Sequence, residues 1–186
     1  MKKFELTTKF ITNVAGKKLF RIKALVEFGN VKAGELGGYV EKEGNISQDG
    51  NAWVAGNAWV DGNATVSGNA KVHGNAWVTD NTEVAGNATV SGNATVSGNA
   101  TVSGNAEVSG NTDYALAQGF GTEFRCTTFY RGKNKKIMVN CGCFHGDLEE
   151  FRKQVKETRS GKIAKEYLMI ADLMEYHFAS EDSDDE

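Results

Sequence analysis

The repeated middle of the chain contains one residue of a type that often catalyses proton transfer. His73 is the sole histidine between residues 50 and 115, and a neutral imidazole can take a proton from a hydroxyl or an amine. It follows a valine at a place where the chain is expected to turn. A lone exposed histidine is more often a surface residue than a base, so we expect no catalytic residue here.

A second candidate site combines three cysteines with His145. Residues 122–145 are predicted to form a hairpin around a turn at residues 132–134. Pairing across that turn would place residues of both strands on one face, namely Phe124, Cys126, Tyr130, Ile137, Val139, Cys141 and Cys143. Zinc accepts three cysteines and one histidine, but the spacing Cys-x-Cys-x-His is uncommon for it. Because free cysteine is also a normal core residue, we expect a packed core and neither a metal nor a cofactor.

Three tryptophans form the third candidate site. Trp53, Trp59 and Trp77 lie near the start of the repeat, with Lys71 between them in the sequence. Exposed tryptophan is costly to leave bare and is enriched at interfaces. We therefore interpret Trp53, Trp59, Trp77, Lys71 and His73 as a binding or interface surface. We expect the tryptophans to pack under the N-terminal hairpin or against another subunit, and a surface for a partner or a ligand is the alternative.

These residues must be positioned by a repeat of six residues that runs without insertion from Gly50 to Ala115. Asparagine is invariant at the second place, and glycine at the first is replaced once, by Asp80. Alanine and valine stand two residues apart, so both point inward from a short strand, and the variable residue between them points outward. Glycine and asparagine tolerate the left-handed backbone of a corner. Each repeat is thus one short strand and one corner, and the units must stack to bury their apolar faces.

The pattern Val-x-Gly-Asn-Ala-x resembles the hexapeptide repeat of left-handed β-helices. The resemblance implies three repeats per coil, asparagine ladders between coils, and outward residues aligned in columns. The expected columns are Ser47, Thr65, Glu83, Thr101; Trp53, Lys71, Thr89, Glu107; and Trp59, Trp77, Thr95, Asp113. Proteins with this repeat commonly form trimers, so we expect a homo-oligomer, with a trimer preferred over a dimer.

The flanks of the repeat differ from it and from each other. Residues 1–44 predict a β-hairpin cap with a turn at Asn-Val-Ala-Gly, and residues 45–116 form the β-helix. Residues 117–180 predict a small ββαα unit, whose first helix begins at Asp147 with Glu150 completing a capping box. The acidic residues 181–186 are expected to be disordered. The fold class is therefore mainly β, a single-stranded left-handed β-helix with a hairpin cap and a C-terminal ββαα unit.

Composition excludes several classes of protein. The net charge is −3, which argues against a general nucleic-acid binder, because such proteins show a basic field. No apolar run reaches the length of a signal peptide or a transmembrane helix, so we expect a cytoplasmic protein without membrane contact. Three cysteines, an odd number, favour free thiols over a disulfide framework.

Both ends of the chain resemble uncharacterised hexapeptide-repeat proteins of bacteriophages and prophages, in RIKALVEFGNVKAGELGGYVEKEGNISQDGNAWV and VNCGCFHGDLEEFRKQVKET. We therefore expect a non-catalytic interaction protein that binds, and inhibits, a protein of the host bacterium, such as a defence factor. An acetyl-CoA-dependent acyltransferase at a subunit interface is the first alternative. The uninterrupted repeat, without the excursion loop usual in those enzymes, argues against it. A sponge for a small signalling nucleotide is the second alternative.

Overall fold

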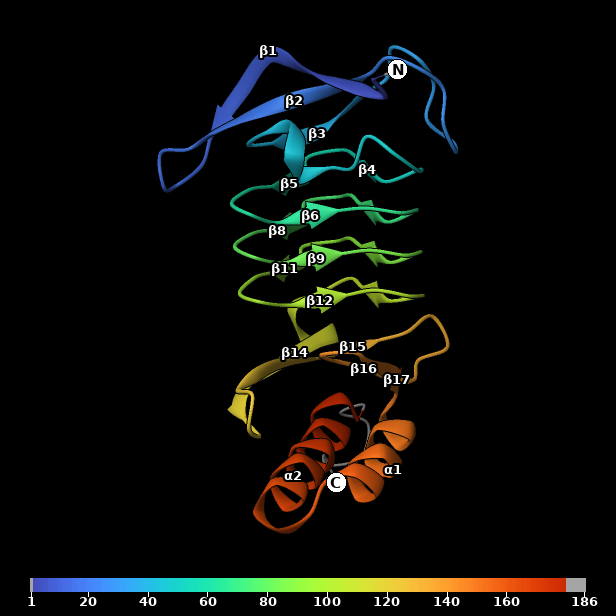
Figure 1. Ribbon diagram of the computed structural model, residues 1–186. Coiled ribbons are helices and arrows are strands. Elements are labelled where there is room, and N and C mark those ends of the chain that lie inside the picture. Colours follow the sequence, from blue (N-terminus) through green and yellow to red (C-terminus); the bar gives the residue numbers. More distant parts are fainter. Residues whose placement is uncertain (1, 180–186) are drawn as a thin grey trace, which may run out of the picture. The chain divides into compact units, whose positions relative to one another are not determined.

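The computed structural model describes residues 2–179 and divides into two compact units, Met1–Asn111 and Thr112–Glu186 (Figure 1). The first unit is a β-solenoid that begins with an antiparallel sheet, and the second is an antiparallel sheet with two helices. The mainly β fold with its hairpin cap and its two C-terminal helices is thereby confirmed. The left-handed winding stays a prediction, and the acidic segment 181–186 lies outside the described residues.

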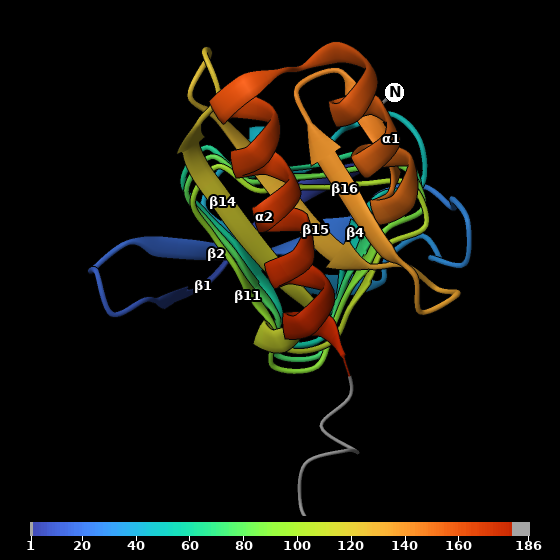
Figure 2. The same cartoon turned by 90° about the horizontal axis from the view of Figure 1, so that it is seen from below.

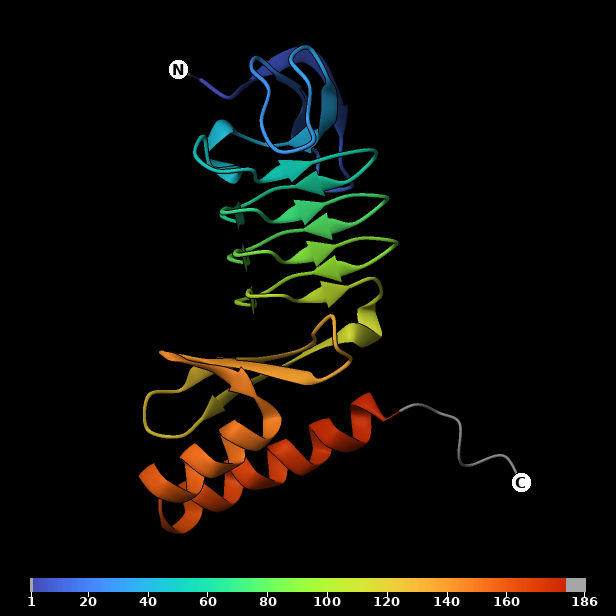
Figure 3. The same ribbon diagram turned by 90° about the vertical axis from the view of Figure 1, so that its right-hand side faces the viewer.

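The solenoid is built from strands of two residues, one in each repeat. They are β4 (Trp53–Val54), β5 (Trp59–Val60), β6 (Thr65–Val66), β7 (Lys71–Val72), β8 (Trp77–Val78), β9 (Glu83–Val84), β10 (Thr89–Val90), β11 (Thr95–Val96), β12 (Thr101–Val102) and β13 (Glu107–Val108). Equivalent strands of successive coils pair in parallel, which gives the ladders β5-β8-β11, β4-β7-β10-β13 and β6-β9-β12. Figure 3 shows the strands recurring at the same places from coil to coil.

The interior of the coils is narrow because alanine and valine fill nearly all of its places. The valines from Val54 to Val108 are fully buried, and the alanines at the third place of the repeat are nearly so. Where Thr82 replaces alanine, its hydroxyl donates to the carbonyl of Val96 at 3.5 Å, so the buried polar group has a partner. The inward and outward places predicted from the repeat are confirmed.

The corners use left-handed backbone and stacked asparagines. Gly86 has φ +68°, and a Cβ there would lie 2.9 Å from the backbone nitrogen of Gly104 in the next coil. Asp80 adopts the same conformation, with φ 61°, and its carboxylate accepts the N–H of Gly98 at 2.9 Å. The asparagines donate side chain to side chain between coils, as in Asn69 to Asn87 at 3.0 Å. The predicted asparagine ladders are therefore confirmed.

The N-terminal hairpin is also confirmed. Strand β1 (Phe4–Thr12) pairs with β2 (Lys18–Ala24) across the predicted turn, where the Asn13 side chain accepts the N–H groups of Ala15 and Lys17. A third strand, β3 (Leu36–Val40), lies antiparallel to β2 and parallel to β5. It therefore joins the antiparallel sheet to the first ladder of the solenoid.

Different groups close each ladder at the N-terminal end of the solenoid. On the first ladder, β3 continues the parallel pairing. On the second, the ammonium of Lys3 donates to the carbonyls of Ala52 at 3.0 Å and Gly50 at 3.4 Å, which in later coils accept N–H groups of the preceding coil. On the third, the side chain of Asn45 donates to the carbonyl of Ala64 at 2.8 Å. The carbonyl edge that a solenoid would otherwise expose is thus hydrogen-bonded on each ladder.

Two ends of the predicted columns are wrong. Ile46 pairs with Val66, so isoleucine takes the inward place in the first coil and Ser47 does not align with Thr65. Ile46 follows the 3₁₀ turn Glu43–Asn45, and the segment from Ile46 to Val54 is longer than one repeat, which shifts the register. At the other end Asp113 belongs to a 3₁₀ turn, Asn111–Asp113, and not to a two-residue strand as the repeat predicted. The remaining column positions are confirmed.

The sheet of the C-terminal unit has four strands, two more than the sequence predicted. They are β14 (Tyr114–Phe120), β15 (Arg125–Arg131), β16 (Ile137–Cys141) and β17 (Phe144–Asp147), paired in chain order. Helices α1 (Leu148–Thr158) and α2 (Gly161–Phe178) lie over one face of this sheet (Figure 2). The core between them contains Phe129, Val139, Leu148, Phe151, Val155, Ile170, Ala171, Met174 and Phe178.

The predicted face of the β15–β16 hairpin is wrong for half of its residues. Arg131 pairs with Ile137, so the connection 132–136 has an odd number of residues and positions of equal parity share a face. Cys126 and Tyr130 therefore lie on the face opposite to Val139 and Cys141. A shift of one residue in the turn exchanges the two faces of a strand, and sequence alone did not show this turn length.

The helices follow their predicted signals closely. Asp147 accepts the backbone N–H of Glu150, and the Glu150 side chain accepts the N–H of Asp147, which confirms the capping box. The predicted apolar stripe of α1 is buried, and that of α2 either is buried or packs against the same core. Ser160 separates the helices as the N-cap of α2.

Candidate functional site

The outward residues of the first ladder form an aromatic column of Tyr39, Trp59 and Trp77. The register pairs Tyr39 with Trp59 and Trp59 with Trp77. The two indoles are stacked, with ring centroids 4.8 Å apart and planes 8° from parallel, and both side chains are partly exposed. Because each indole covers one face of the other, the pair presents ring edges to the outside. It therefore suits a partner with its own apolar side chains better than a flat molecule that would lie on a ring.

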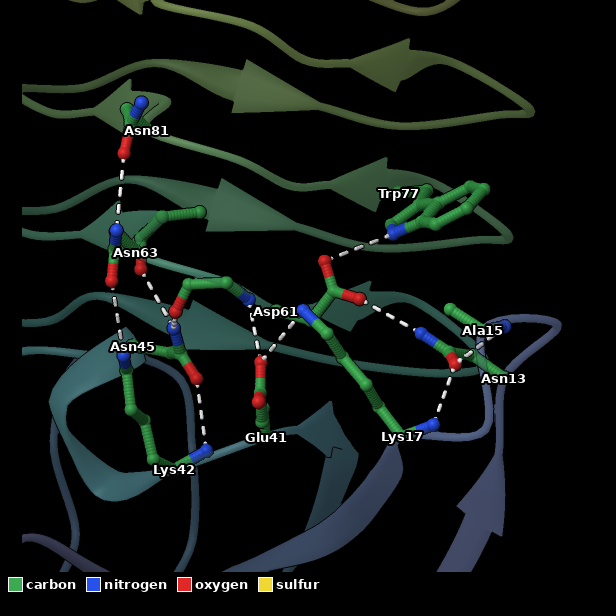
Figure 4. A network of polar contacts seen from close by, with 12 residues as sticks. Asn13, Ala15, Lys17, Glu41, Lys42, Asn45, Asp61, Asn63, Trp77 and Asn81 are labelled. Atoms are coloured by element: carbon green, nitrogen blue, oxygen red, sulfur yellow. Dashed lines mark hydrogen bonds and ion pairs between the residues drawn. The ribbon is translucent and has the colours of Figure 1, made fainter.

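Asp61 holds one side of the aromatic column in place (Figure 4). Its carboxylate is 2% exposed and accepts the indole N–H of Trp77 at 3.4 Å and the side-chain amide of Asn13 at 2.9 Å. Asn13 belongs to the turn of the N-terminal hairpin, so this turn and the second coil are linked through a single carboxylate. A buried carboxylate with two donors restricts the rotamer of Trp77 and organises the column before any partner arrives.

Charged groups surround the column. The Glu41 carboxylate accepts the N–H of Gly62 at 2.7 Å and the ammonium of Lys17 at 3.4 Å. These interactions, the backbone N–H first, hold the pKa of Glu41 below its ordinary value. On the other side, Arg21 donates to the Tyr39 hydroxyl at 3.0 Å and lies over its ring. An apolar strip with a charged rim is the usual composition of a protein-binding surface.

Trp53 has a different environment from the other two tryptophans. It is 5% exposed and makes edge contacts with the rings of Phe4 and Phe28, at centroid distances of 6.4 and 5.4 Å. A Cβ at Gly37 would come within 2.6 Å of its indole, so this glycine is what makes room for the ring. Trp53 therefore serves as a contact of the cap, which is one of the two kinds of packing expected from the sequence.

Lys71 and His73 are exposed but do not join the aromatic column. Lys71 lies on β7, between Trp53 and Thr89 in the second ladder, whereas Trp59 and Trp77 belong to the first. His73 follows in the corner after β7. The structure thus brings together two of the five residues singled out from the sequence. It adds Tyr39 and Asp61, which lie outside the outward places of the repeat and could not be found from them.

The cysteines of the C-terminal unit do not converge. Cys126 lies on the opposite face of the sheet from Cys141, and Cys143 is exposed in the turn between β16 and β17. His145 pairs with Asn140, on the face away from Cys141, and its ring contacts the Asn140 side chain. Between residues 2 and 179, no three His, Cys, Asp or Glu side chains are grouped as metal ligands. The pKa of the Cys126 thiol is raised, chiefly by burial.

A pocket in the C-terminal unit escaped the sequence analysis. It has a volume of about 80 Å³ and is lined by Thr122, Glu123, Arg125, Cys141, Cys143, Phe144, Phe151, Gln154, Val155, Thr158, Arg159 and Tyr167. The sequence placed Phe151 and Tyr167 in the core, but the arginines carried no recognisable spacing. The sequence analysis also did not predict β17 or the turn at Gly142, against which the guanidinium of Arg125 lies.

Comparisons with known proteins do not identify the chain. No protein-family model matches it, and a search of curated proteins finds no similar sequence. Within the described part of the chain, no helix is long and apolar enough to cross a membrane.

Proposed function

We propose that the chain is a non-catalytic interaction protein that binds another protein through its aromatic column. The observation that carries this proposal is the stacked, partly exposed pair of Trp59 and Trp77 on a ladder whose next outward residue is Thr95. Tryptophan is the residue type most enriched among those that dominate binding energy at interfaces. Nothing in the repeat itself requires an aromatic residue at this place, because threonine fills it in later coils.

The scaffold supports tight binding because it is already ordered. Each coil donates its backbone N–H groups to carbonyls of the next coil at about 3 Å, for example Trp59 to Ala76 at 3.0 Å. Asp61 further restricts Trp77. A surface that loses little conformational freedom on binding keeps more of its contact energy as affinity.

The partner is a protein of a bacterial host, and binding inhibits it. This part of the proposal is supported by the resemblance of both chain ends to proteins of phages and prophages, and a defence factor is the first target to examine. The scaffold acts as a homo-oligomer in the host cytoplasm. Acyl transfer is less well supported, because His73 lies at an exposed corner of uninterrupted coils.

The experiment compares capture of bacterial proteins by the wild-type chain and by the double variant Trp59→Thr/Trp77→Thr. Threonine is the natural residue at this place in the next coil, so the variant should keep the coils intact, which circular dichroism and melting check. The control Lys71→Thr/Glu107→Thr makes the same kind of change on the second ladder. We expect a specific host protein to be captured by the wild type and the control and lost with the tryptophan variant. Equal capture by all three would refute the role of the column.

A separate assay addresses catalysis. Acetyl-CoA turnover with a panel of small hydroxyl and amine acceptors should stay at the background rate. Turnover that disappears with His73→Ala would replace the proposal with acyl transfer. Tight binding of a cyclic dinucleotide or an ADP-ribose derivative would replace it with nucleotide sequestration.

A further inference from the structure

The pocket of the C-terminal unit has an apolar floor. Phe144, Phe151 and Tyr167 line it, and their rings contact one another in sequence, with centroid distances of 5.5 Å for Phe144–Phe151 and 5.9 Å for Phe151–Tyr167. The floor is continuous with the buried core through Phe151 and Val155. A volume of about 80 Å³ exceeds the roughly 15 Å³ that one ordered water needs, so a group of several non-hydrogen atoms fits.

The rim of the pocket carries two arginines, Arg125 and Arg159. Arg125 lies against the turn of the β16–β17 hairpin, because a Cβ at Gly142 would come within 2.6 Å of its guanidinium. Glycine at this turn, with φ +61°, therefore leaves the space that the guanidinium occupies. The other rim charge is Glu123, so the mouth keeps a net positive charge.

The partners of these arginines differ from those of the other arginines in the unit. Arg152 pairs with Glu149, Asp172 and Glu175, and Arg131 pairs with Asp113. Within residues 2–179, in contrast, no ion pair involves Arg125 or Arg159, and the guanidinium of Arg159 donates to the neighbouring carbonyl of Thr158 at 3.3 Å.

Tyr167 adds a neutral polar group to the pocket. Its hydroxyl donates to the carbonyl of Phe120 at 3.3 Å, which ties α2 to the end of β14. Burial, followed by the nearby Cys141, raises the pKa of this phenol, while Arg159 and Arg125 act in the opposite direction. Arg125, Arg159 and Tyr167 all line this one pocket.

We propose that this pocket binds a small carboxylic acid with an apolar tail, its carboxylate held by Arg125 and Arg159 and its tail on Phe144 and Phe151. Guanidinium groups match the planar carboxylate and can bind it through paired hydrogen bonds. The aromatic floor gives an apolar tail a place that an inorganic anion cannot use. This inference is independent of the proposed role of the aromatic column.

Two thiols provide a direct report on occupancy. Cys141 and Cys143 line the pocket, whereas Cys126 lies on the other face of the sheet. A bound acid should slow the reaction of Cys143 with a thiol reagent such as iodoacetamide. It should also slow the reaction of Cys141 where the reagent has access to this thiol. Peptide mapping of the full-length protein resolves the three cysteines, so Cys126 serves as an internal control.

The test titrates the full-length protein with acetate, butyrate, hexanoate and inorganic phosphate, followed by calorimetry and by thiol protection. We expect affinity to increase from acetate to butyrate and Cys143 to be protected. The variant Arg125→Gln/Arg159→Gln should weaken butyrate binding at least about tenfold. The control Lys156→Gln/Lys165→Gln removes the same charge from exposed helix positions and should bind as the wild type does.

Three results would overturn the proposal. One is the absence of saturable binding by all three carboxylates. Another is unchanged binding in the arginine variant, provided that its melting temperature matches that of the wild type. The third is phosphate binding as tight as butyrate binding, which would leave a simple anion site without a role for the aromatic floor.

Discussion

The coils and the C-terminal unit bury their apolar residues in different ways. In the coils nearly every repeat contributes one alanine and one valine to the interior, with Thr82 in place of one alanine, and no aromatic side chain enters it. In the C-terminal unit the core depends on rings, with Phe129 and Phe144 both packed against Phe151. A periodic core fixes the environment of a residue by its place in the repeat, whereas an aromatic core depends on how strands and helices are registered.

The two regions also expose different amounts of apolar surface. Among the described residues, none of the large exposed hydrophobic side chains comes from the coils between Gly44 and Val108. The C-terminal unit exposes several, and three of them, Met169, Leu173 and Tyr176, are 60, 58 and 77% exposed on one side of α2. Stripes of this kind mark interaction sites more often than isolated exposed residues do. This contrast favours self-association through α2 and leaves the aromatic column for another protein.

The largest expected effect therefore concerns assembly. We expect the wild-type chain to be a homo-oligomer at micromolar concentration and the variant Met169→Gln/Leu173→Gln to be a monomer, because the substitutions remove apolar surface from α2 without a loss of helix propensity. Light scattering after size-exclusion chromatography gives both masses. It also tests the trimer expected from the repeat.

The tryptophan variant provides the control for assembly. Trp59→Thr/Trp77→Thr should keep the oligomer, since it changes only the coils. Loss of the oligomer in this variant, with assembly intact in the α2 variant, would reverse the assignment of the two surfaces. A monomeric wild type would remove the idea of self-association altogether.

The second prediction tests the periodic core by itself. Val90→Asp places a carboxylate in the closed interior and should lower the free energy of unfolding by at least about 3 kcal/mol. Thr89→Asp changes the neighbouring outward residue and should cost less than about 1 kcal/mol. Urea unfolding followed by circular dichroism measures both. Similar losses at the two positions would mean that the interior tolerates charge, against the geometry of the coils.

The coils could be predicted almost completely from the sequence because their pattern is local. Ala-x-Val assigns two inward residues and one outward residue, and the constant spacing aligns Trp59 with Trp77 in neighbouring coils. The prediction failed where the spacing changes, at Ile46, because the segment between Ile46 and the first strand of the repeat contains extra residues. The aromatic column was found only in part, since Tyr39 lies on a strand outside the repeat.

The C-terminal unit was less predictable because its pairing depends on turns of unusual conformation. Phe124 and Lys135 adopt positive φ values, 49° and 61°, which cannot be predicted from their residue types. Lys135 lies in the connection whose odd length exchanged the faces of Cys126 and Cys141. The helices were predicted correctly because the capping box of Asp147 and the spacing of apolar residues are local signals.

The third prediction concerns Lys3, whose ammonium donates to the carbonyls at the N-terminal end of the second ladder. Burial lowers the pKa of Lys3 to about 8 from an ordinary value of 10.5. Between these pH values the unfolded chain holds a proton that the folded chain has released, so the free energy of unfolding should increase with pH, by at most about 3 kcal/mol. Urea unfolding at pH 8 and pH 10 measures the change.

The variant Lys3→Met should abolish this dependence, whereas Lys2→Met, at an exposed neighbour paired with Glu43, should retain it. The difference between wild type and variant isolates Lys3 from other groups that titrate in alkali. A pH dependence that is unchanged in Lys3→Met would show that the ammonium is not desolvated beneath the cap.

The smallest expected effect distinguishes the two helix starts of the C-terminal unit. Asp147 accepts the N–H of Glu150 at 3.0 Å and the ammonium of Lys136 at 2.8 Å, whereas the Ser160 side chain makes no capping hydrogen bond to α2. Asp147→Ala should therefore cost about 1 kcal/mol and Ser160→Ala less than about 0.5 kcal/mol. The hydrogen bond from Lys136, followed by that from the backbone N–H of Glu150, lowers the pKa of Asp147 from its ordinary value of 3.8. The loss of stability in Asp147→Ala should therefore be full at neutral pH and disappear as acid protonates the carboxylate. Urea unfolding at pH 7 and pH 3 measures this difference. Equal costs for the two substitutions would mean that the capping box does not set where α1 begins, and that packing of Leu148 and Phe151 suffices.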